Sequence, residues 1–165
     1  VVGTMVEGKP NWVLVGHIGI IGHDRVMVSL AGAHYSNRGI KETKKLSINI
    51  VDEALLPLAD RAGCVSGAKE DKSDLFDYTV GDTGAPLMTA APVVMECSVD
   101  DVYETKGFES FICTIDHTFA EERVLTPEDK IDYRVLKPVL FEMPTCEYLR
   151  TGDVIGKCMS WGKGK

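Results

Sequence analysis

Regular alternation of apolar and polar residues predicts that most of this chain folds as β-strands. Residues 46–50 alternate with a period of two, which indicates a strand with one buried face. Two longer alternating stretches, 93–100 and 111–116, flank a turn at Lys106–Gly107 and predict an antiparallel pair. In the first of these, one face carries apolar side chains, and the other carries Glu96, Ser98 and Asp100.

The remaining elements predicted from the pattern are short. Residues 11–21 and 25–31 predict a hairpin around Gly22–Asp24, and residues 139–141 predict a last short strand. Capping and turn residues indicate four short helical segments, at 40–45, from Asp52–Leu55 to near Gly63, at 71–76, and from 127–129 onward. Long antiparallel strands with few helices favour a mainly β closed barrel over a parallel α/β sheet. No linker or repeat divides the chain, so we expect one domain over residues 1–165.

Composition and charge narrow the class of protein. The chain has 165 residues, 44% hydrophobic and 26% charged, as in an ordinary globular domain. Its net charge of −7 argues against nucleic acid as a partner, and no apolar run approaches the length of a membrane span. The first residues lack the basic start of a signal peptide and look like a strand entered midway, so the natural chain is expected to begin earlier. Five scattered cysteines favour neither a disulfide framework nor a zinc site, so no bound metal is expected. The absence of a disulfide pattern favours a reducing compartment, and we expect the protein in the cytoplasm.

The segment Gly32–Gly39 is the strongest candidate for chemistry. It follows an apolar strand and precedes the helical stretch at 40–45, which places backbone N–H groups at a helix N-terminus. His34, Ser36 and Arg38 add side-chain donors, so the segment predicts an anion site, most simply for a phosphate group. The alternative is that Ser36 or Asn37 only caps a surface helix.

The glycines between Gly16 and Gly22 do not indicate a dinucleotide fingerprint. They have the spacing G-x-x-G-x-x-G inside an apolar run, and no helix follows them. Glycines within a strand instead mark a bend or the close approach of another group.

The order of these segments resembles that of a known family. The chain carries Gly8-Lys9-Pro10-Asn11, a strand ending in Asn49-Ile50, a loop Cys64-Val65-Ser66-Gly67 leading to Asp71-Lys72, and Phe141-Glu142-Met143-Pro144 near the end. In this order the motifs resemble the flavin reductase-like family of FMN-binding split barrels, which includes the flavoredoxins. The resemblance implies an antiparallel six-stranded Greek-key split barrel, FMN as cofactor, and a homodimer with the flavin near the interface.

The resemblance also implies which residues contact FMN. Gly16 and Gly19 would leave room for the flavin ring, Asn49 would bind the ribityl-phosphate chain, and Lys72 would bring positive charge to the phosphate. His17 could donate to the ring or point to solvent. The full set of expected cofactor-binding residues is Val15, Gly16, His17, Ile18, Gly19, Ser29, Ala31, His34, Tyr35, Ser36, Arg38, Asn49, Ser66 and Lys72.

Three functions are compatible with such a site. The first is an NAD(P)H-dependent reductase of flavin or another small acceptor, in which hydride passes to the flavin N5 and no catalytic side chain is needed. The second is a flavoredoxin-type electron carrier that exchanges electrons with a redox protein. The third is a related barrel that binds haem or pyridoxine phosphate, although only four histidines could ligate haem. Cys64, beside the expected cofactor segment, is the candidate for a redox-active thiol.

Overall fold

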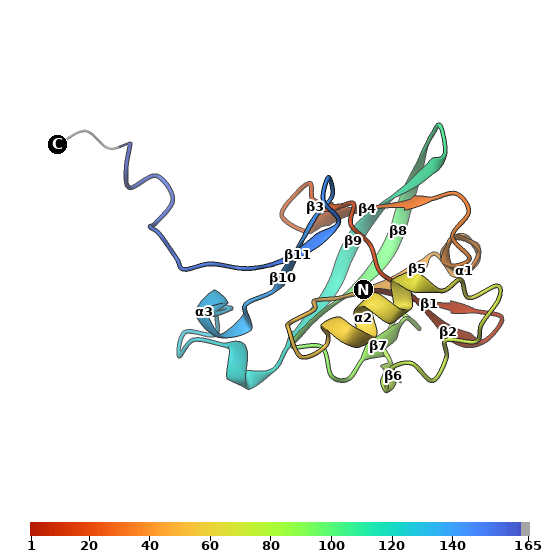
Figure 1. Ribbon diagram of the computed structural model, residues 1–165, viewed down its shortest axis with the longest axis horizontal. Coiled ribbons are helices and arrows are strands. Elements are labelled where there is room, and N and C mark those ends of the chain that lie inside the picture. The colour runs from red at the N-terminus through yellow and green to blue at the C-terminus, as the bar shows by residue number, and fades with distance from the viewer. Residues whose placement is uncertain (163–165) are drawn as a thin grey trace.

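The computed structural model describes residues 1–162 and is dominated by one antiparallel sheet (Figure 1). The sheet has seven strands in the order β2-β1-β5-β8-β9-β4-β3. Every neighbouring pair is antiparallel. Its strands are β1 (Val2–Val6), β2 (Lys9–Val13), β3 (Ile18–Ile20), β4 (Arg25–Ala31), β5 (Lys45–Asn49), β8 (Val93–Thr105) and β9 (Phe108–Ala120). The mainly β, antiparallel architecture predicted from the sequence is confirmed.

The stretch predicted as one strand at 11–21 is two strands, and this break splits the barrel. β2 pairs with β1 at one edge of the sheet, whereas β3 pairs with β4 at the other edge. Residues 14–17 therefore join the two edges outside any strand. Counting β2 and β3 as one interrupted strand gives the expected six strands, and counting them separately gives seven. The predicted hairpin around Gly22–Asp24 is the pair β3–β4.

The longest hairpin is formed by β8 and β9 and turns at Gly107, whose φ of +89° suits glycine. Glu96 lies on the polar face of β8, yet its side chain is fully buried. Glu96 is covered by the loop between β6 (Tyr78–Val80) and β7 (Pro86–Met88), two strands that pair as a small second sheet. There Glu96 Oε1 accepts hydrogen bonds of 2.7 and 2.6 Å from the Thr83 N–H and hydroxyl.

The helices are short, as predicted, but two of the four predicted segments begin at another residue and two form turns. Helix α1 (Ser36–Thr43) begins four residues before the predicted start, and α2 (Leu56–Cys64) begins one residue after the segment in which Asp52 accepts two backbone N–H bonds. The segment at 71–76 forms turns, and residues 127–129 form a turn between the 3-10 helix η1 (Glu122–Val124) and α3 (Tyr133–Leu136).

The core lies inside the main sheet and against α2. One buried cluster comprises side chains from β1, β2, β4, β5, β8, β9 and α1, including Cys97 and Cys113, whose burial raises the pKa of both thiols well above the ordinary range. A second cluster surrounds Trp12, which meets Phe76 edge-on at 5.4 Å. The two thiols thus serve as small side chains of the core.

The C-terminal part adds a hairpin and an extended segment. Strands β10 (Val139–Glu142) and β11 (Glu147–Arg150) pair with each other, and residues 151–162 then lead away from the body (Figure 1). No helix among residues 1–162 is long and apolar enough to cross a membrane.

Candidate functional site

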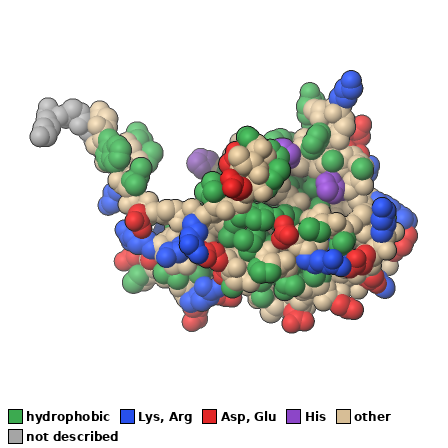
Figure 2. Space-filling model, in the orientation of Figure 1, with side chains coloured by type: hydrophobic (Ala, Val, Ile, Leu, Met, Phe, Trp, Pro, Cys, Tyr) green, Lys and Arg blue, Asp and Glu red, His purple; other side chains and the backbone are tan. Residues whose placement is uncertain are grey.

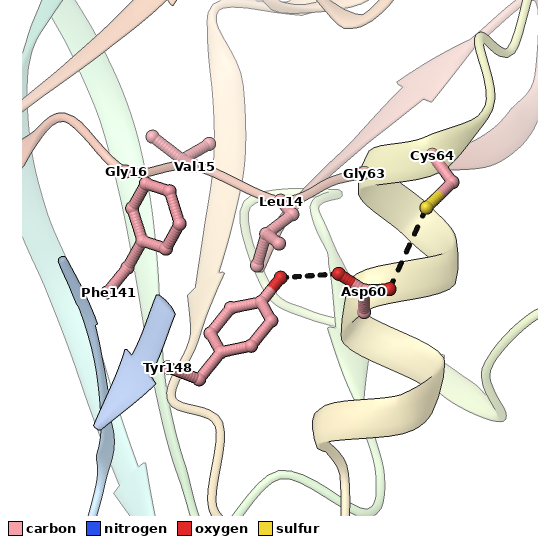
Figure 3. A pocket seen from close by; sticks show the side chains of 8 residues that line it. All are labelled: Leu14, Val15, Gly16, Asp60, Gly63, Cys64, Phe141 and Tyr148. Carbon is pink, nitrogen blue, oxygen red and sulfur yellow. Dashed lines mark hydrogen bonds between the residues drawn. The ribbon is translucent and has the colours of Figure 1, made fainter. Parts of the chain in front are cut away.

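A cleft of about 330 Å³ opens where the barrel is split (Figure 3). Its floor is the interrupted strand at Leu14, Val15 and Gly16, and one wall is the C-terminal turn of α2. The opposite wall is the β10–β11 hairpin, which contributes Phe141 and Tyr148. A second cavity of about 250 Å³ shares Leu14–Gly16, Phe141 and Tyr148, and extends past Ile18 and Asn49.

The C-terminal hairpin is attached to both sides of this cleft. The Tyr148 hydroxyl donates a 2.5 Å hydrogen bond to Asp60 Oδ1 on α2. Burial and the Asp60 carboxylate raise the pKa of Tyr148 to about 12, so the phenol keeps its proton at neutral pH. Near the other end, a Cβ atom on Gly16 would lie 3.1 Å from Phe141 and 3.4 Å from Met143. The absence of a side chain at Gly16 therefore lets the hairpin pack over the barrel break.

The first turn of α1 has backbone donors without partners. Tyr35 occupies the N-cap position and makes no side-chain capping bond. Among residues 1–162 the Tyr35 and Ser36 N–H groups make no hydrogen bond. The alternative in which Ser36 or Asn37 caps the helix is wrong. Ser36 Oγ accepts a 2.7 Å bond from Asn11, and the Asn37 amide donates to the Ala31 carbonyl and the Glu109 carboxylate.

Lys72 lies near this helix start. Its largely buried ammonium donates to the carbonyls of Ala62 at 3.0 Å and Val65 at 3.1 Å, which leaves one of three N–H groups for another acceptor. Desolvation lowers the pKa of Lys72 below its usual value. Partial desolvation and the nearby charge of Lys72 also lower the pKa of His34. We call His34, Lys72 and the N–H groups of Tyr35 and Ser36 the anion corner.

The chain from Gly63 to Gly67 links the anion corner to the cleft. Gly63 lies against Leu14 at the cleft floor, and a Cβ on Gly67 would lie 2.1 Å from the Asn11 amide oxygen and 2.7 Å from the Tyr35 ring. Tyr35, Gly67 and Lys72 also line a common surface cavity of about 320 Å³. A molecule with an anionic end and a flat apolar end could therefore follow residues 63–67 from one part of the site to the other.

Several expected site residues have other contacts in the structure. The Asn49 amide donates to Val1 O and Ser47 Oγ, and its oxygen accepts from the Met88 N–H. Both amide N–H groups are thus used within the fold, and the expected contact of Asn49 with the ribityl-phosphate chain stays a prediction. Arg38 is exposed and forms a 2.7 Å ion pair with Glu7, so its guanidinium is directed to the β1–β2 turn.

The remaining expected residues are spread around the site. The Ala31 carbonyl accepts the His34 N–H, and Ser29 faces Ser110 at 2.9 Å. His17 is exposed and lies edge-on to Phe108 at 5.4 Å, whereas its carbonyl accepts the Ser29 N–H. Ser66 is exposed, and its hydroxyl accepts the Ala68 N–H at 3.3 Å.

For two of the residues expected to contact FMN, Gly19 and Ile18, the structure shows no contact that indicates a role in binding. Gly19 has open space where a side chain would be, so nothing in the fold requires glycine there. Ile18 is exposed at the rim of the second cavity.

Comparison with known proteins decides the family. The sequence model of the flavin reductase like domain matches residues 1–138. The chain belongs to the flavin reductase-like family. This result confirms the resemblance found in the sequence and supports a flavin-related function. A comparison with the curated proteins found no match.

Solved structures of this family have the same fold. The flavoredoxin from Methanosarcina acetivorans is 29% identical, with a TM-score of 0.94 over 98% of this chain and 88% of that one. The flavoredoxin of Desulfovibrio vulgaris (Miyazaki F) is 30% identical, with a TM-score of 0.91 over 98% of this chain and 90% of that one. The FMN-binding protein from Thermus thermophilus, solved with bound 1-cyclohex-2-enone, is 18% identical, with a TM-score of 0.83 over 94% of this chain and 87% of that one, and shows the shared fold.

Sequence reasoning about this flavin reductase-like protein missed two residues that line the cleft and one that lies beneath the anion corner. Asp60 and Tyr148 are 88 positions apart and meet only through the fold. Asn11 was read as part of a hairpin motif, yet its side chain is buried and contacts Ser36 beneath the anion corner. The motif Phe141–Pro144 was the available signal for the hairpin wall, although it gave no role for Phe141.

Proposed function

We propose that this protein binds FMN, with the phosphate at the anion corner and the flavin ring over Leu14–Gly16. The observation that carries the proposal is the pairing of unpartnered N–H groups and a buried lysine with an open cleft at the barrel break. Helix N-termini and lysine side chains are common phosphate ligands. The donor set therefore fits a phosphate monoester, and the cleft walls of Val15, Phe141 and Leu14 fit an apolar ring.

Each residue has a defined task in this proposal. Lys72 and the N–H groups of Tyr35 and Ser36 hold the phosphate, and His34 adds a donor when protonated. Asn11 fixes Ser36 from below. Gly67 lets residues 63–67 pack closely against Asn11 and Tyr35, because a side chain there would collide with both. Val15, Gly16, His17 and Ile18 form the side of the cleft past which the ring would lie. We also include Ser29, Ala31 and Ser66 among the residues proposed to lie next to the bound cofactor.

The proposed reaction is NAD(P)H-dependent reduction of a flavin or another small acceptor. Bound FMN would supply the redox chemistry by accepting hydride at N5 from a reduced nicotinamide. The chain's own contribution is to bind, orient and partly shield the reactants within the cleft. The Tyr148 phenol stays protonated and acts here as a hydrogen-bonded wall of the cleft.

This function is tested by recording the visible spectrum of the purified protein with FMN and then adding NADH or NADPH under anaerobic conditions. We expect flavin absorbance that bleaches with at least one nicotinamide and returns on adding an acceptor in air. FAD should bind more weakly than FMN, because its adenylate would have to pass the anion corner. Preference for FAD, or no flavin bound, would contradict the FMN assignment.

A second candidate is a flavoredoxin-type electron carrier. It is favoured by the two flavoredoxin structures, which match 98% of this chain at 29% and 30% identity. If neither nicotinamide bleaches the flavin but a reduced redox protein does, the carrier function replaces the reductase. A protein that binds haem or pyridoxine phosphate instead would be recognised by its spectrum.

The pKa of His34 gives an independent test of the anion corner. Without ligand, desolvation and Lys72 hold this pKa below its usual value. A phosphate dianion beside the ring favours the protonated form, so FMN binding should raise the pKa and take up protons between the two values. NMR titration of the His34 ring with FMN and with riboflavin checks this. The pKa should rise only with FMN, and a His34→Gln variant should identify the resonance.

We further propose that two copies form a homodimer that covers the cleft, and that the protein works in the cytoplasm with NAD(P)H or a redox protein as partner. The dimer is supported by exposed apolar side chains at the cleft rim, including Ile18 and Phe141. Light scattering at a monomer mass with FMN bound would contradict it.

A further inference from the structure

We propose that residues 151–162, called the C-terminal arm, cross to a second copy of the chain and dock there. The inference rests on the proposed dimer and names the segment that builds it. Figure 2 shows hydrophobic side chains of the arm standing away from the body. Four of them, Val154, Ile155, Met159 and Trp161, are between 56% and 82% exposed. So much exposed apolar surface on one short segment marks a contact with another molecule.

The arm is anchored only at its base. The Thr151 hydroxyl donates to the Pro138 carbonyl, and the preceding Arg150 donates from Nε and Nη2 to the Glu53 carboxylate. Beyond that point, the hydrogen bonds of the described arm residues stay within the arm, from Ser160 to the Lys157 carbonyl. The base is held and directed outward, so the apolar part does not return to its own body.

The body has a matching apolar surface beside the base of the arm. It is defined by Ile18, Ile20, Ile21, Leu140, Met143 and Leu149, which are between 44% and 63% exposed. These residues come from the β3 region and the β10–β11 hairpin, which meet at the barrel break, where Ile18 and Leu140 line one cavity and Gly16 lies against Met143. We call them the arm-docking surface.

Geometry and charge both favour a second copy as the occupant. A two-fold axis near the base of the arm places each arm beside the partner's docking surface, so the same contact forms twice. Twelve residues span up to about 40 Å when extended, which is enough to cross an interface. Residues 151–162 carry one lysine and one aspartate, so the arm itself is neutral. Lys163 and Lys165 follow it in the sequence, and a second copy of a chain with a net charge of −7 attracts these two charges.

The two tryptophans make the test direct. Trp12 is fully buried and Trp161 is 75% exposed in the single chain. In an arm-exchanged dimer, Trp161 should be shielded from iodide quenching at micromolar concentration and become accessible on dilution, with the Trp161→Phe variant giving the Trp12 background. The experiment uses the protein without flavin, so failed FMN binding would not affect its outcome.

Variants on both sides of the contact complete the test. Trp161→Ser, removal of residues 152–165, and Ile20→Lys should each raise the dimer dissociation constant by about thirtyfold or more, the size of an interface hot spot. Val80→Lys is the matched control, because Val80 is 60% exposed on β6 outside the docking surface. A dimer whose dissociation constant is unchanged by removing residues 152–165 would overturn arm exchange while leaving the proposed dimer intact. A monomer, or a Trp161 shielded equally at all concentrations, would also overturn it.

Discussion

A Gly39→Ala variant is expected to lose about 2–3 kcal/mol of folding free energy and to bind FMN more weakly. Gly39 lies on the face of α1 that packs against β1. A Cβ atom there would be 2.3 Å from the Met5 carbonyl oxygen and 2.6 Å from a Val6 methyl group. The carbonyl belongs to a paired strand and cannot move aside, so α1 must shift, and overpacking of this kind costs about 1–3 kcal/mol or more.

The same shift would move the first turn of α1, which carries the Tyr35 and Ser36 N–H groups of the anion corner. Urea unfolding of the flavin-free protein and a fluorescence titration with FMN measure the two effects. Gly19→Ala is the control, since a Cβ there meets open space and the stability should change by less than about 0.5 kcal/mol. Equal stability of the Gly39 and Gly19 variants would show that α1 does not pack on β1 as described.

The strands were predictable because alternation directly reports burial of one face. β5, the β8–β9 hairpin and the β3–β4 hairpin all lie where that pattern indicated. Alternation did not reveal the burial of Glu96, whose face is covered by a loop that closes through Gly81 and Thr83. Alternation with a period of two cannot distinguish a strand face exposed to water from one covered by a distant segment. A buried carboxylate that is hydrogen-bonded looks the same in the sequence as an exposed one.

The barrel break shows a second limit of sequence reading. Leu14 and Val15 continue the apolar run from β2, so nothing in their hydropathy indicates that pairing stops there. The chain leaves the sheet at this point because β2 and β3 pair at opposite edges, which is a property of the topology. The wall of the cleft was equally hidden, since the bond from Tyr148 to Asp60 joins residues far apart in the chain.

The anion corner was partly predictable. The strand-turn-helix pattern indicated a helix N-terminus near His34–Ser36 that could bind an anion. The family resemblance implied the contribution of Lys72. The sequence could not tell which polar side chains the fold would use internally. Arg38 and Asn49 were expected at the phosphate and ribityl chain, yet the first pairs with Glu7 and the second joins β5 to Val1 and Met88.

Replacing Lys72 by methionine is expected to weaken FMN binding by between about tenfold and a hundredfold. Methionine is similar in length but has no charge and no N–H donor. A hydrogen bond to a charged group is worth about 1.5–3 kcal/mol, which converts to that range of affinity. The same change leaves the carbonyls of Ala62 and Val65 without their donor, so some folding stability should also be lost.

Comparing FMN with riboflavin separates these two effects of Lys72. Riboflavin has no phosphate, so a loss of the phosphate contact lowers the FMN affinity while the riboflavin affinity changes little. Lys69→Met, an exposed position in the same loop, is the matched control and should leave both affinities within about twofold. If Lys72→Met weakened FMN and riboflavin equally, the lysine would serve only to hold the end of α2. The phosphate would then have to bind elsewhere, and the assignment of the anion corner would be wrong.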